Sequence, residues 1–527
     1  GTKFGYDDEN RPTSLTYSIG ATTIGQSTTT IDKLNRTTFS AVKLGSKTFT
    51  SEYHFAAGGY GTGSVTNLVS SITQPGCNCG YGYDDNGNIA SATLNGKWTG
   101  YTYDELGQLI QVNDHSDTRS GENGTTWKYT YDLGGNILKK ERFAYNDTTN
   151  PLETVTYTYG DANWRDKLTA VNGSAIRYDA IGNPLSDGTW TYTWQNGRQL
   201  QKMQKSGVTA EFVYNADGLR VQKTVNGVVT GYTLHGKNVV HMTKGNDELH
   251  FFYDAQNRPA MVVYNGAAYA YVKSLQGDIV AILDENGNTV VSYGYDAWGA
   301  PLWCTGELAE TLGKVQPFRY RGYVFDEETG LYYLRSRYYN PRWGRFVNAD
   351  AEIAVEAKLW DAKLFLYCAN NPVRYTDDGG NSFWDVLADC GKALLVAAVV
   401  VAVVAVVIAA TGGGGGFALA AAGGEIISGA AVADAAMTTA VAAGATGASL
   451  MFASRAGKKF EEDYYSNHYK SHNQAENGQF KEAVRRLKDN YDMNLTQNQQ
   501  QRLHYAIRHK GYSLEEIIEE ALNMFGE

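Results

Sequence analysis

A Tyr-Asp pair recurs between residues 6 and 296, and this repeat limits the possible folds more than any other feature of the chain. A turn residue and then an apolar residue usually follow the pair, as in YGYDDNGNI (81–89) and YTYDELGQL (101–109). Asp and Gly stand where a tight turn needs them, and aromatic residues alternate with polar ones. The repeat therefore predicts β-hairpins in series. The copies begin at Tyr6, Tyr83, Tyr103, Tyr131, Tyr178, Tyr253 and Tyr295, with looser copies at Tyr159 and Tyr214.

The copies are unevenly spaced, which argues against a solenoid of fixed period. An open ribbon of hairpins would leave strand edges exposed, whereas a ribbon that curls into a closed wall removes them. The chain has 37 Tyr against 18 Phe, and tyrosine suits a wall that is wet on both faces. We expect a mainly β fold in which the hairpins form a hollow shell. A series of ordinary β-sandwiches is the alternative.

Charge and cysteine content exclude some classes of function. The net charge of −10 argues against a protein that wraps nucleic acid over its whole surface, although a small basic site is still allowed. The five cysteines include one close pair, Cys77 and Cys79, without the second pair of a four-ligand zinc motif. We therefore expect buried thiols, no metal and no cofactor.

Two further segments carry a family resemblance. RYRGYVFDEETGLYYLRSRYYNPRWGRFVNAD (319–350) and NPVRYTDDGG (371–380) follow the Tyr-Asp repeats. Together they resemble the YD-repeat and Rhs-core family of polymorphic toxins, to which the C component of Tc toxins and the teneurins are related. The resemblance covers roughly residues 1–380. It implies a β-shell over 1–318, closed by an Rhs core over 319–380, that encloses a toxic C-terminal polypeptide until delivery.

The residues of this core also predict a local structure. A turn at 327–330 follows Phe325, and residues 331–339 are expected to return as one strand. Alternation would then place Arg335 and Arg337 on the same face as neighbouring tyrosines. Guanidinium groups there could stack on the rings and hold carboxylates. We interpret both arginines as residues that close the shell, and a direct catalytic role is the alternative.

The resemblance implies a self-cleavage site at the end of the core. In the family a pair of aspartates can cut the chain and release the toxin inside the shell, and the matching residues here are Asp350 and Asp377. Two adjacent carboxylates can share a proton, one acting as a base on water and the other as an acid. Ala351 and Asp378 stand where the family usually has Pro. A structural end of the shell without cleavage is the alternative.

The composition changes after the core. Residues 393–410 and 435–454 are uncharged apolar stretches, each long enough to span a bilayer as a helix. Basic residues at both outer ends and small residues within suit a helical hairpin. We expect 381–455 to be an apolar, membrane-active linker that helps the tail across a target membrane. A membrane anchor and an inert lining of the shell are the alternatives.

The tail, 456–527, is expected to be a small, mostly helical effector domain. Capping residues and apolar spacing predict helices over 480–490, 496–510 and 513–525. His504 and Arg508 are four residues apart on one predicted helix, and His509 follows them. A histidine that moves protons beside an arginine that holds phosphate would suit phosphodiester cleavage without a metal. Histidines on a solvated helix face are the alternative.

These observations lead to a hypothesis of function. We expect a secreted or cell-surface bacterial toxin whose effector is a nuclease that acts in the target cell. Its partners would be its own tail inside the shell, an immunity protein, a target membrane and nucleic acid. A cell-surface adhesion or carbohydrate-binding protein is one alternative. A toxin that forms pores through residues 393–454 is the other.

Overall fold

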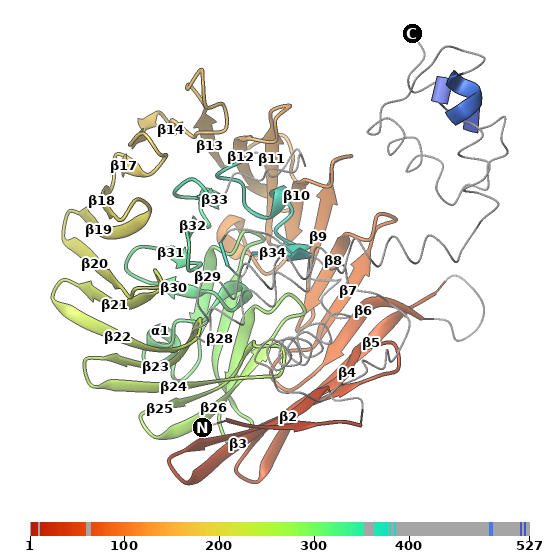
Figure 1. Cartoon of the computed structure of the whole chain (residues 1–527), viewed down its shortest axis with the longest axis vertical. Coiled ribbons are helices and arrows are strands. Elements are labelled where there is room, and N and C mark those ends of the chain that lie inside the picture. Colours follow the sequence, from red (N-terminus) through yellow and green to blue (C-terminus); the bar gives the residue numbers. More distant parts are fainter. Residues whose placement is uncertain are drawn as a thin grey trace. The chain divides into compact units, whose positions relative to one another are not determined.

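The structure is a computed structural model that divides into two compact units, Gly1–Ala397 and Ala398–Glu527. Its description covers residues 2–8, 11–58, 65–351, 363–377, 379–380, 384–385, 484–488, 517–518 and 521–522. Most of these residues belong to the first unit, which consists of β-strands joined in chain order (Figure 1).

The first large sheet has 15 strands, and each pairs with the strands before and after it in the chain. All the pairs are antiparallel, as expected for hairpins in series. The strands are β1 (Thr2–Tyr6), β2 (Pro12–Ile19), β3 (Thr22–Ile31), β4 (Thr37–Leu44), β5 (Lys47–Ala57), β6 (Val65–Thr73), β7 (Cys79–Tyr83), β8 (Ile89–Leu94), β9 (Lys97–Tyr103), β10 (Leu109–Asp114), β11 (Thr125–Tyr131), β12 (Ile137–Ala144), β13 (Glu153–Thr158), β14 (Ala170–Val171) and β15 (Ser174–Ala175).

The second large sheet has 14 strands in the same consecutive order. Short turns join its strands, so this sheet is also built from local contacts. The strands are β16 (Arg177–Tyr178), β17 (Pro184–Ser186), β18 (Thr191–Gln195), β19 (Gln199–Lys205), β20 (Val208–Tyr214), β21 (Arg220–Val225), β22 (Val228–His235), β23 (Asn238–Lys244), β24 (Asp247–Tyr253), β25 (Pro259–Tyr264), β26 (Ala267–Lys273), β27 (Ile279–Leu283), β28 (Thr289–Tyr295) and β29 (Pro301–Thr305).

A four-stranded sheet lies between the two large ones (Figure 1). Its strands are β30 (Val324–Asp326), β31 (Leu331–Tyr333), β32 (Tyr338–Asn340) and β33 (Arg345–Phe346). Helical turns and one further strand pair complete the described elements of the first unit: η1 (Thr118–Ser120), α1 (Leu312–Val315), η2 (Tyr320–Gly322), η3 (Cys368–Asn370), β34 (Tyr375–Thr376) and β35 (Trp384–Asp385).

The aspartate of each Tyr-Asp pair closes the turn that follows it. In the copy at Asp84, one carboxylate oxygen accepts from the backbone N–H groups of Asn86 and Asn88 at 3.0 and 2.8 Å. The other oxygen accepts from the side-chain amide of Asn88 at 2.9 Å. Gly87 has a φ of +74°, which a residue with a Cβ adopts only with strain. The hydrogen-bonding groups of the turn thus find their partners within the five residues 84–88.

In seven copies of the repeat, the tyrosine hydroxyl bonds to the backbone of a preceding strand. The Tyr103 hydroxyl donates to the backbone carbonyl of Ile89 at 2.7 Å, and Ile89 is the apolar residue after the previous turn. A half-buried ring with a bonded hydroxyl explains why the wall uses tyrosine instead of phenylalanine. The same bond links Tyr83 to Val69, Tyr131 to Leu109, Tyr159 to Ile137, Tyr214 to Leu200, Tyr253 to Val239 and Tyr295 to Ile279.

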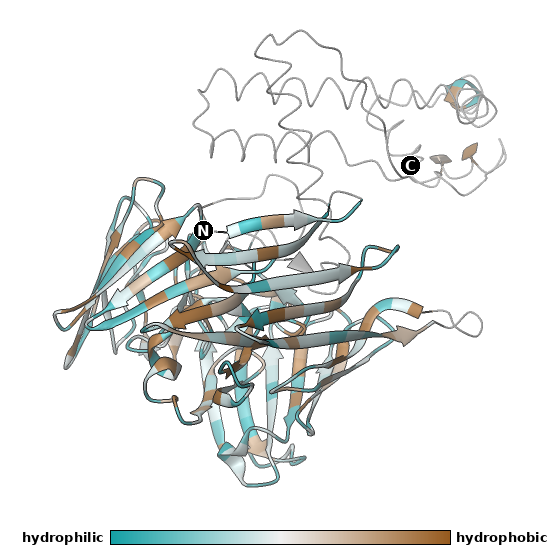
Figure 2. Ribbon diagram, turned by 90° about the horizontal axis from the view of Figure 1, so that it is seen from below, coloured by the Kyte–Doolittle hydropathy of each residue, from teal (hydrophilic) through white to brown (hydrophobic). Residues whose placement is uncertain are grey.

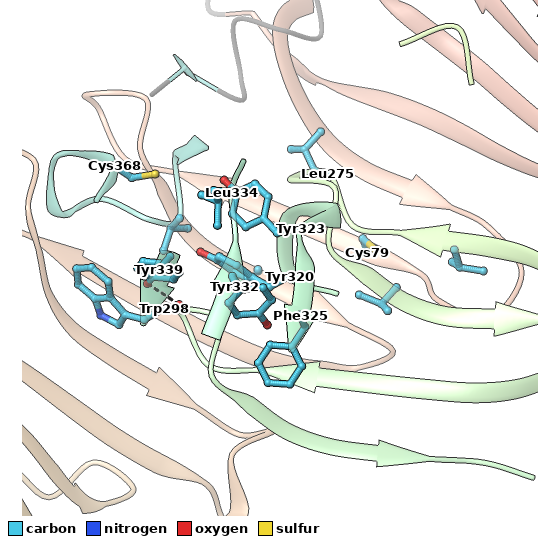
Figure 3. Packing of buried hydrophobic residues seen from close by; sticks show 14 of the residues in the cluster. Cys79, Leu275, Trp298, Tyr320, Tyr323, Phe325, Tyr332, Leu334, Tyr339 and Cys368 are labelled. Carbon is cyan, nitrogen blue, oxygen red and sulfur yellow. Dashed lines mark hydrogen bonds between the residues drawn. The ribbon is translucent and has the colours of Figure 1, made fainter. Parts of the chain in front are cut away.

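Hydrophobic and hydrophilic residues alternate along many strands of the large sheets, so each sheet has a more apolar face (Figure 2). The largest buried cluster combines residues of both large sheets with the aromatic residues of the four-stranded sheet. Figure 3 shows Tyr320, Tyr323, Tyr332 and Tyr339 close together in this cluster, and the Tyr339 hydroxyl donates to the carbonyl of Trp298 at 2.7 Å. The described residues of the 319–380 segment therefore pack as an aromatic core against the sheets.

The structure confirms the mainly β class and corrects one detail of the core. Residues 331–339 were expected to form one strand, but β31 ends at Tyr333 and β32 begins at Tyr338. Leu334 donates its N–H to the carbonyl of Arg337 at 2.9 Å, and Arg335 has a φ of +67°. The two arginines therefore lie in a tight turn instead of on one face of a strand. That the shell is closed and hollow stays a prediction.

The predictions for the C-terminal part lie mostly outside the described residues. Residues 484–488, 517–518 and 521–522 are helical, and Leu487, Ile517 and Ala521 are buried. The apolar stretches 393–410 and 435–454 are not among the described residues, and neither are His504, Arg508 and His509. Within the described ranges, no helix has the length and apolar character that a membrane crossing requires.

Candidate functional site at the end of the core

The candidate site forms where three segments of the core meet. Arg337 is the last residue of the turn before β32, Asp350 follows β33, and Asp377 follows β34. Backbone bonds join these segments: Phe346 and Asp350 donate their N–H groups to the carbonyls of Phe365 and Leu364 at 3.1 and 2.8 Å. The residues therefore meet through pairing of the chain around 346–350 with the chain around 364–365.

One guanidinium group lies against both aspartates. Nη2 of Arg337 is 3.0 Å from Oδ2 of Asp350 and 3.4 Å from Oδ2 of Asp377. The two aspartates are only 8 % and 2 % exposed, and Arg337 is 4 % exposed. Charges in such a place are strongly desolvated and need close partners. The cation of Arg337 supplies a partner for both carboxylates.

Asp377 is also held by the backbone and by a tyrosine. Its Oδ1 accepts from the N–H groups of Gly379 and Gly380 at 3.3 and 2.7 Å. Its own N–H donates to the hydroxyl oxygen of Tyr323 at 2.7 Å. Tyr323 belongs to the aromatic cluster in Figure 3 and also contacts the hydroxyl of Thr376 at 2.8 Å. The aromatic core thus sets the position of Asp377.

Two other donors of Arg337 contact backbone carbonyls, one before and one after Asp377 in the chain. Its Nε donates to the carbonyl of Gly380, and its Nη1 donates to the carbonyl of Leu364 at 3.1 Å. The guanidinium carbon lies 3.5 Å from the centre of the Phe346 ring. Burial lowers the pKa of Arg337 below its ordinary value, while the charges of the two aspartates act in the opposite direction. The group bridges two carboxylates and two backbone carbonyls.

The site combines two carboxylates, which can act as acid or base, with the Gly380 carbonyl, which Arg337 polarises. A carboxylate can take a proton from water, and a guanidinium donor can stabilise charge on a carbonyl oxygen. The guanidinium group of Arg337 contacts both carboxylates and compensates their negative charge. The side chains present therefore fit hydrolysis of a peptide bond without a metal.

The structure places the two predicted aspartates at one site, where Arg337 Nη2 contacts an oxygen of each. That they share a proton stays a prediction. Arg337 was expected to close the shell, with a catalytic role as the alternative, and Tyr323 was not expected at this site. Arg337 holds carboxylates, as predicted, but the ring that it lies against belongs to Phe346 instead of a tyrosine. The cleavage role of the aspartates stays a prediction.

Long antiparallel sheets made of Tyr-Asp hairpins, packed on an aromatic core with this site at its end, define the class of YD-repeat β-shell proteins. The family model described as Teneurin YD-shell matches residues 92–373. The chain belongs to this family, which confirms the resemblance to YD-repeat and Rhs-core polymorphic toxins.

Several curated relatives are nucleases or toxins. The chain is 37 % identical over 292 residues to the tRNA3(Ser)-specific nuclease WapA of Bacillus spizizenii, covering 54 % of this chain and 12 % of the relative. It is 25 % identical over 333 residues to the toxin protein Tse5 of Pseudomonas aeruginosa, covering 48 % of this chain and 25 % of the relative. The chain thus spans a quarter or less of the length of these relatives.

Solved structures show the same fold. The crystal structure of the TcdB2–TccC3–Cdc42 complex contains a chain that matches with a TM-score of 0.54 and 18 % identity. The match covers 74 % of this chain and 22 % of that one. At this identity the likeness concerns the architecture of the sheets.

Proposed function

We propose that this chain is part of a polymorphic toxin whose shell encloses its own C-terminal polypeptide and whose core cuts that polypeptide free. Membership of the family and the similarity to named toxins support the general function. The observation that carries the cleavage step is the position of Arg337, which contacts Asp350, Asp377 and the carbonyl of Gly380.

The geometry supports a specific cleavage step at the peptide bond between Gly380 and Asn381. Asp350 takes a proton from water as the water oxygen attacks the carbonyl carbon of Gly380. Arg337 stabilises the charge that develops on the carbonyl oxygen. The proton then passes from Asp350 to the leaving nitrogen of Asn381, and the C–N bond breaks. Asp377 keeps residues 379 and 380 in place through the two N–H groups that it accepts.

Gel electrophoresis of the purified full chain tests the cut. The chain has a mass of 57.7 kDa, so cleavage after residue 380 gives fragments of about 41 and about 16 kDa. Asp350→Asn should give one band, and so should Asp377→Ala, which removes the acceptor of the Gly379 and Gly380 N–H groups. Mass spectrometry of the wild type should find Gly380 at the end of the larger fragment. Asp217→Asn, at an exposed turn, is the matched control and should be cut normally. An intact wild-type chain with a folded shell would contradict the proposal.

The released part would be residues 381–527, with an apolar linker over 381–455 and a helical effector over 456–527. We propose that the linker assists passage across a target membrane and that the effector is a nuclease with His504, Arg508 and His509 at its site. The names of the WapA relatives, which are tRNA nucleases, support this activity. An immunity protein that protects the producing cell would then be a partner, and the toxin would act after secretion or display at the cell surface.

A further inference from the structure

Three side chains that bind metals gather on the hairpin of β23 and β24. Nε2 of His241 lies 3.1 Å from Oε1 of Glu248, and Nε2 of His250 lies 3.4 Å from the same oxygen. The two imidazole rings are tilted by 32° with their centres 4.6 Å apart. Two histidines and a carboxylate thus converge on one small region of the second large sheet.

The strand register brings these residues together. His241 pairs directly with His250, and Thr243 pairs with Glu248 two positions along. Because side chains alternate across a strand, His241, Glu248 and His250 share one face of the hairpin. Met242 and Leu249 are on the opposite face and are buried in a hydrophobic cluster. The backbone therefore fixes the positions from which all three polar side chains extend.

The side chains remain open to solvent on their own face. Those of His241 and His250 are 28 % and 30 % exposed, and that of Glu248 is 58 % exposed. Thr233 on the adjacent strand β22 lies opposite His241 in the register, with its hydroxyl 3.5 Å from Nδ1. A partner at Nδ1 orients an imidazole so that Nε2 is free to bind an ion. An ion from solution can reach this group.

We propose that His241, Glu248 and His250 form a site for a divalent transition ion of the Zn²⁺ type. One ligand atom from each residue lies within 4.8 Å of the other two. Zinc takes imidazole nitrogen and carboxylate oxygen at about 2.0–2.2 Å, so small side-chain rotations from this arrangement complete three bonds. Water takes the fourth position on the exposed side. Imidazole ligands favour zinc, copper or nickel over magnesium or calcium.

The ion would cross-link two neighbouring strands of the wall. It binds the folded hairpin, where register holds the ligands together, and finds no preformed site in the unfolded chain. Binding to the folded state alone stabilises that state in proportion to the logarithm of the ion concentration. The site thus provides zinc-dependent stabilisation of the second large sheet, separate from the cleavage chemistry around Arg337.

Calorimetric titration of the full chain with Zn²⁺ tests the site. The wild type should bind one more equivalent of Zn²⁺ than the His241→Ala, His250→Ala double variant. Zn²⁺ that binds at other sites is present in both titrations and cancels in this difference. Glu248→Gln keeps the shape of the side chain but removes the anionic ligand, and it should weaken this equivalent about tenfold or more. His54→Ala removes a histidine from β5 of the first sheet and should leave the difference unchanged.

Thermal unfolding without zinc establishes that each variant is folded before it is titrated. Zinc should then raise the unfolding temperature of the wild type more than that of the double variant. A crystal soaked in Zn²⁺ should show anomalous scattering between the three side chains. Equal stoichiometry in the wild type and a folded double variant would overturn the proposal. If the double variant misfolds, the Glu248→Gln variant provides the test. An unchanged Zn²⁺ affinity in Glu248→Gln would also overturn the proposal.

Discussion

Arg220 and Asp326 form a bidentate ion pair between the wall of the shell and its core. The two guanidinium nitrogens of Arg220 lie 2.6 and 3.0 Å from the two carboxylate oxygens of Asp326, and the residues are 106 positions apart. Both side chains are almost completely buried. Lys223 adds a second cation 3.0 Å from Asp326, and the Tyr333 ring lies 4.4 Å from the Arg220 guanidinium. This pair fixes β30 of the core to β21 of the second sheet.

Replacement of Asp326 by Asn should strongly destabilise the shell. The variant leaves the Arg220 guanidinium buried beside a neutral amide, while Lys223 keeps Glu328 as a partner at 2.7 Å. An uncompensated buried charge costs about 3–5 kcal/mol. Denaturant unfolding followed by tryptophan fluorescence measures the loss. Asp217→Asn at an exposed turn provides the control and should change stability by less than about 0.5 kcal/mol. Equal stability of the two variants would show that the pair contributes little.

The contribution of Asp326 should disappear in acid. Burial acts to raise the pKa of Asp326, but the charges of Arg220 and Lys223 outweigh burial and hold the pKa below its ordinary 3.8. A carboxyl with a lowered pKa in the folded state stabilises that state fully above the unfolded value and loses this contribution as the pH falls. The stability gap between wild type and Asp326→Asn should therefore be constant near neutrality and narrow below about pH 4. Unfolding curves at a series of pH values measure the gap, and a gap that widens in acid would refute the assignment.

Removal of one hydroxyl from the tyrosine series should cost a modest amount of stability. Tyr103→Phe keeps the ring but removes the bond to the carbonyl of Ile89. The expected loss is about 1 kcal/mol in the free energy of unfolding, since the carbonyl loses its side-chain donor in a partly buried place. Tyr6→Phe, at a ring that is 58 % exposed, is the matched control and should be close to neutral. Losses of equal size at both positions would argue against the hydroxyl as the cause.

Arg337→Lys should slow self-cleavage while it keeps a positive charge. Lysine has one nitrogen at its end, and it cannot reproduce the contacts of Arg337 with two aspartates and two carbonyls. Loss of a donor to a reacting carbonyl lowers rates by about a hundredfold to a thousandfold. Cell-free synthesis with samples taken over time gives the rate of cutting. Arg335→Lys, in the same turn, is the control; cutting of Arg337→Lys at the wild-type rate would exclude this role.

Production of residues 456–527 in the bacterial cytoplasm should arrest growth if this segment is a nuclease. His504→Ala should remove the effect without loss of helix content, since Ala favours helices and an acid-base group contributes about a hundredfold to ten-thousandfold in rate. His509→Ala tests whether His509 is catalytic or only favours the end of the predicted helix through its charge. A harmless tail, or a fully toxic His504→Ala tail, would move the proposed toxicity to residues 393–454. Growth curves and total RNA gels provide the measurements.

The hairpins of the wall could be predicted from sequence because their bonds are local. Asp84 and Asn88 are four residues apart, and hydrogen bonds between them close the turn. Their spacing in the sequence is therefore enough to predict the turn. The partners of the tyrosine hydroxyls were less apparent. Tyr103 bonds to the carbonyl of Ile89 across neighbouring strands, and only the register of the sheet shows this.

The candidate site depended more on the tertiary structure. The family resemblance indicated Asp350 and Asp377, but alternation misplaced Arg337 on a strand, since a turn with Arg335 at positive φ interrupts the pattern. His241 and His250 matched no metal-binding motif, and strand pairing alone places them opposite each other. Side chains from distant segments meet only after the backbone has folded.

The mainly β class, the series of hairpins and the family follow from the amino-acid sequence alone, because turn residues and strand alternation act over a few neighbouring positions. Which charged side chains meet depends on the folded chain. Arg220 and Asp326 are far apart in the chain, as are Arg337 and Asp377, and both pairs form in places from which water is excluded. Desolvated charges need partners at close range, and the fold of the core against the wall supplies those partners.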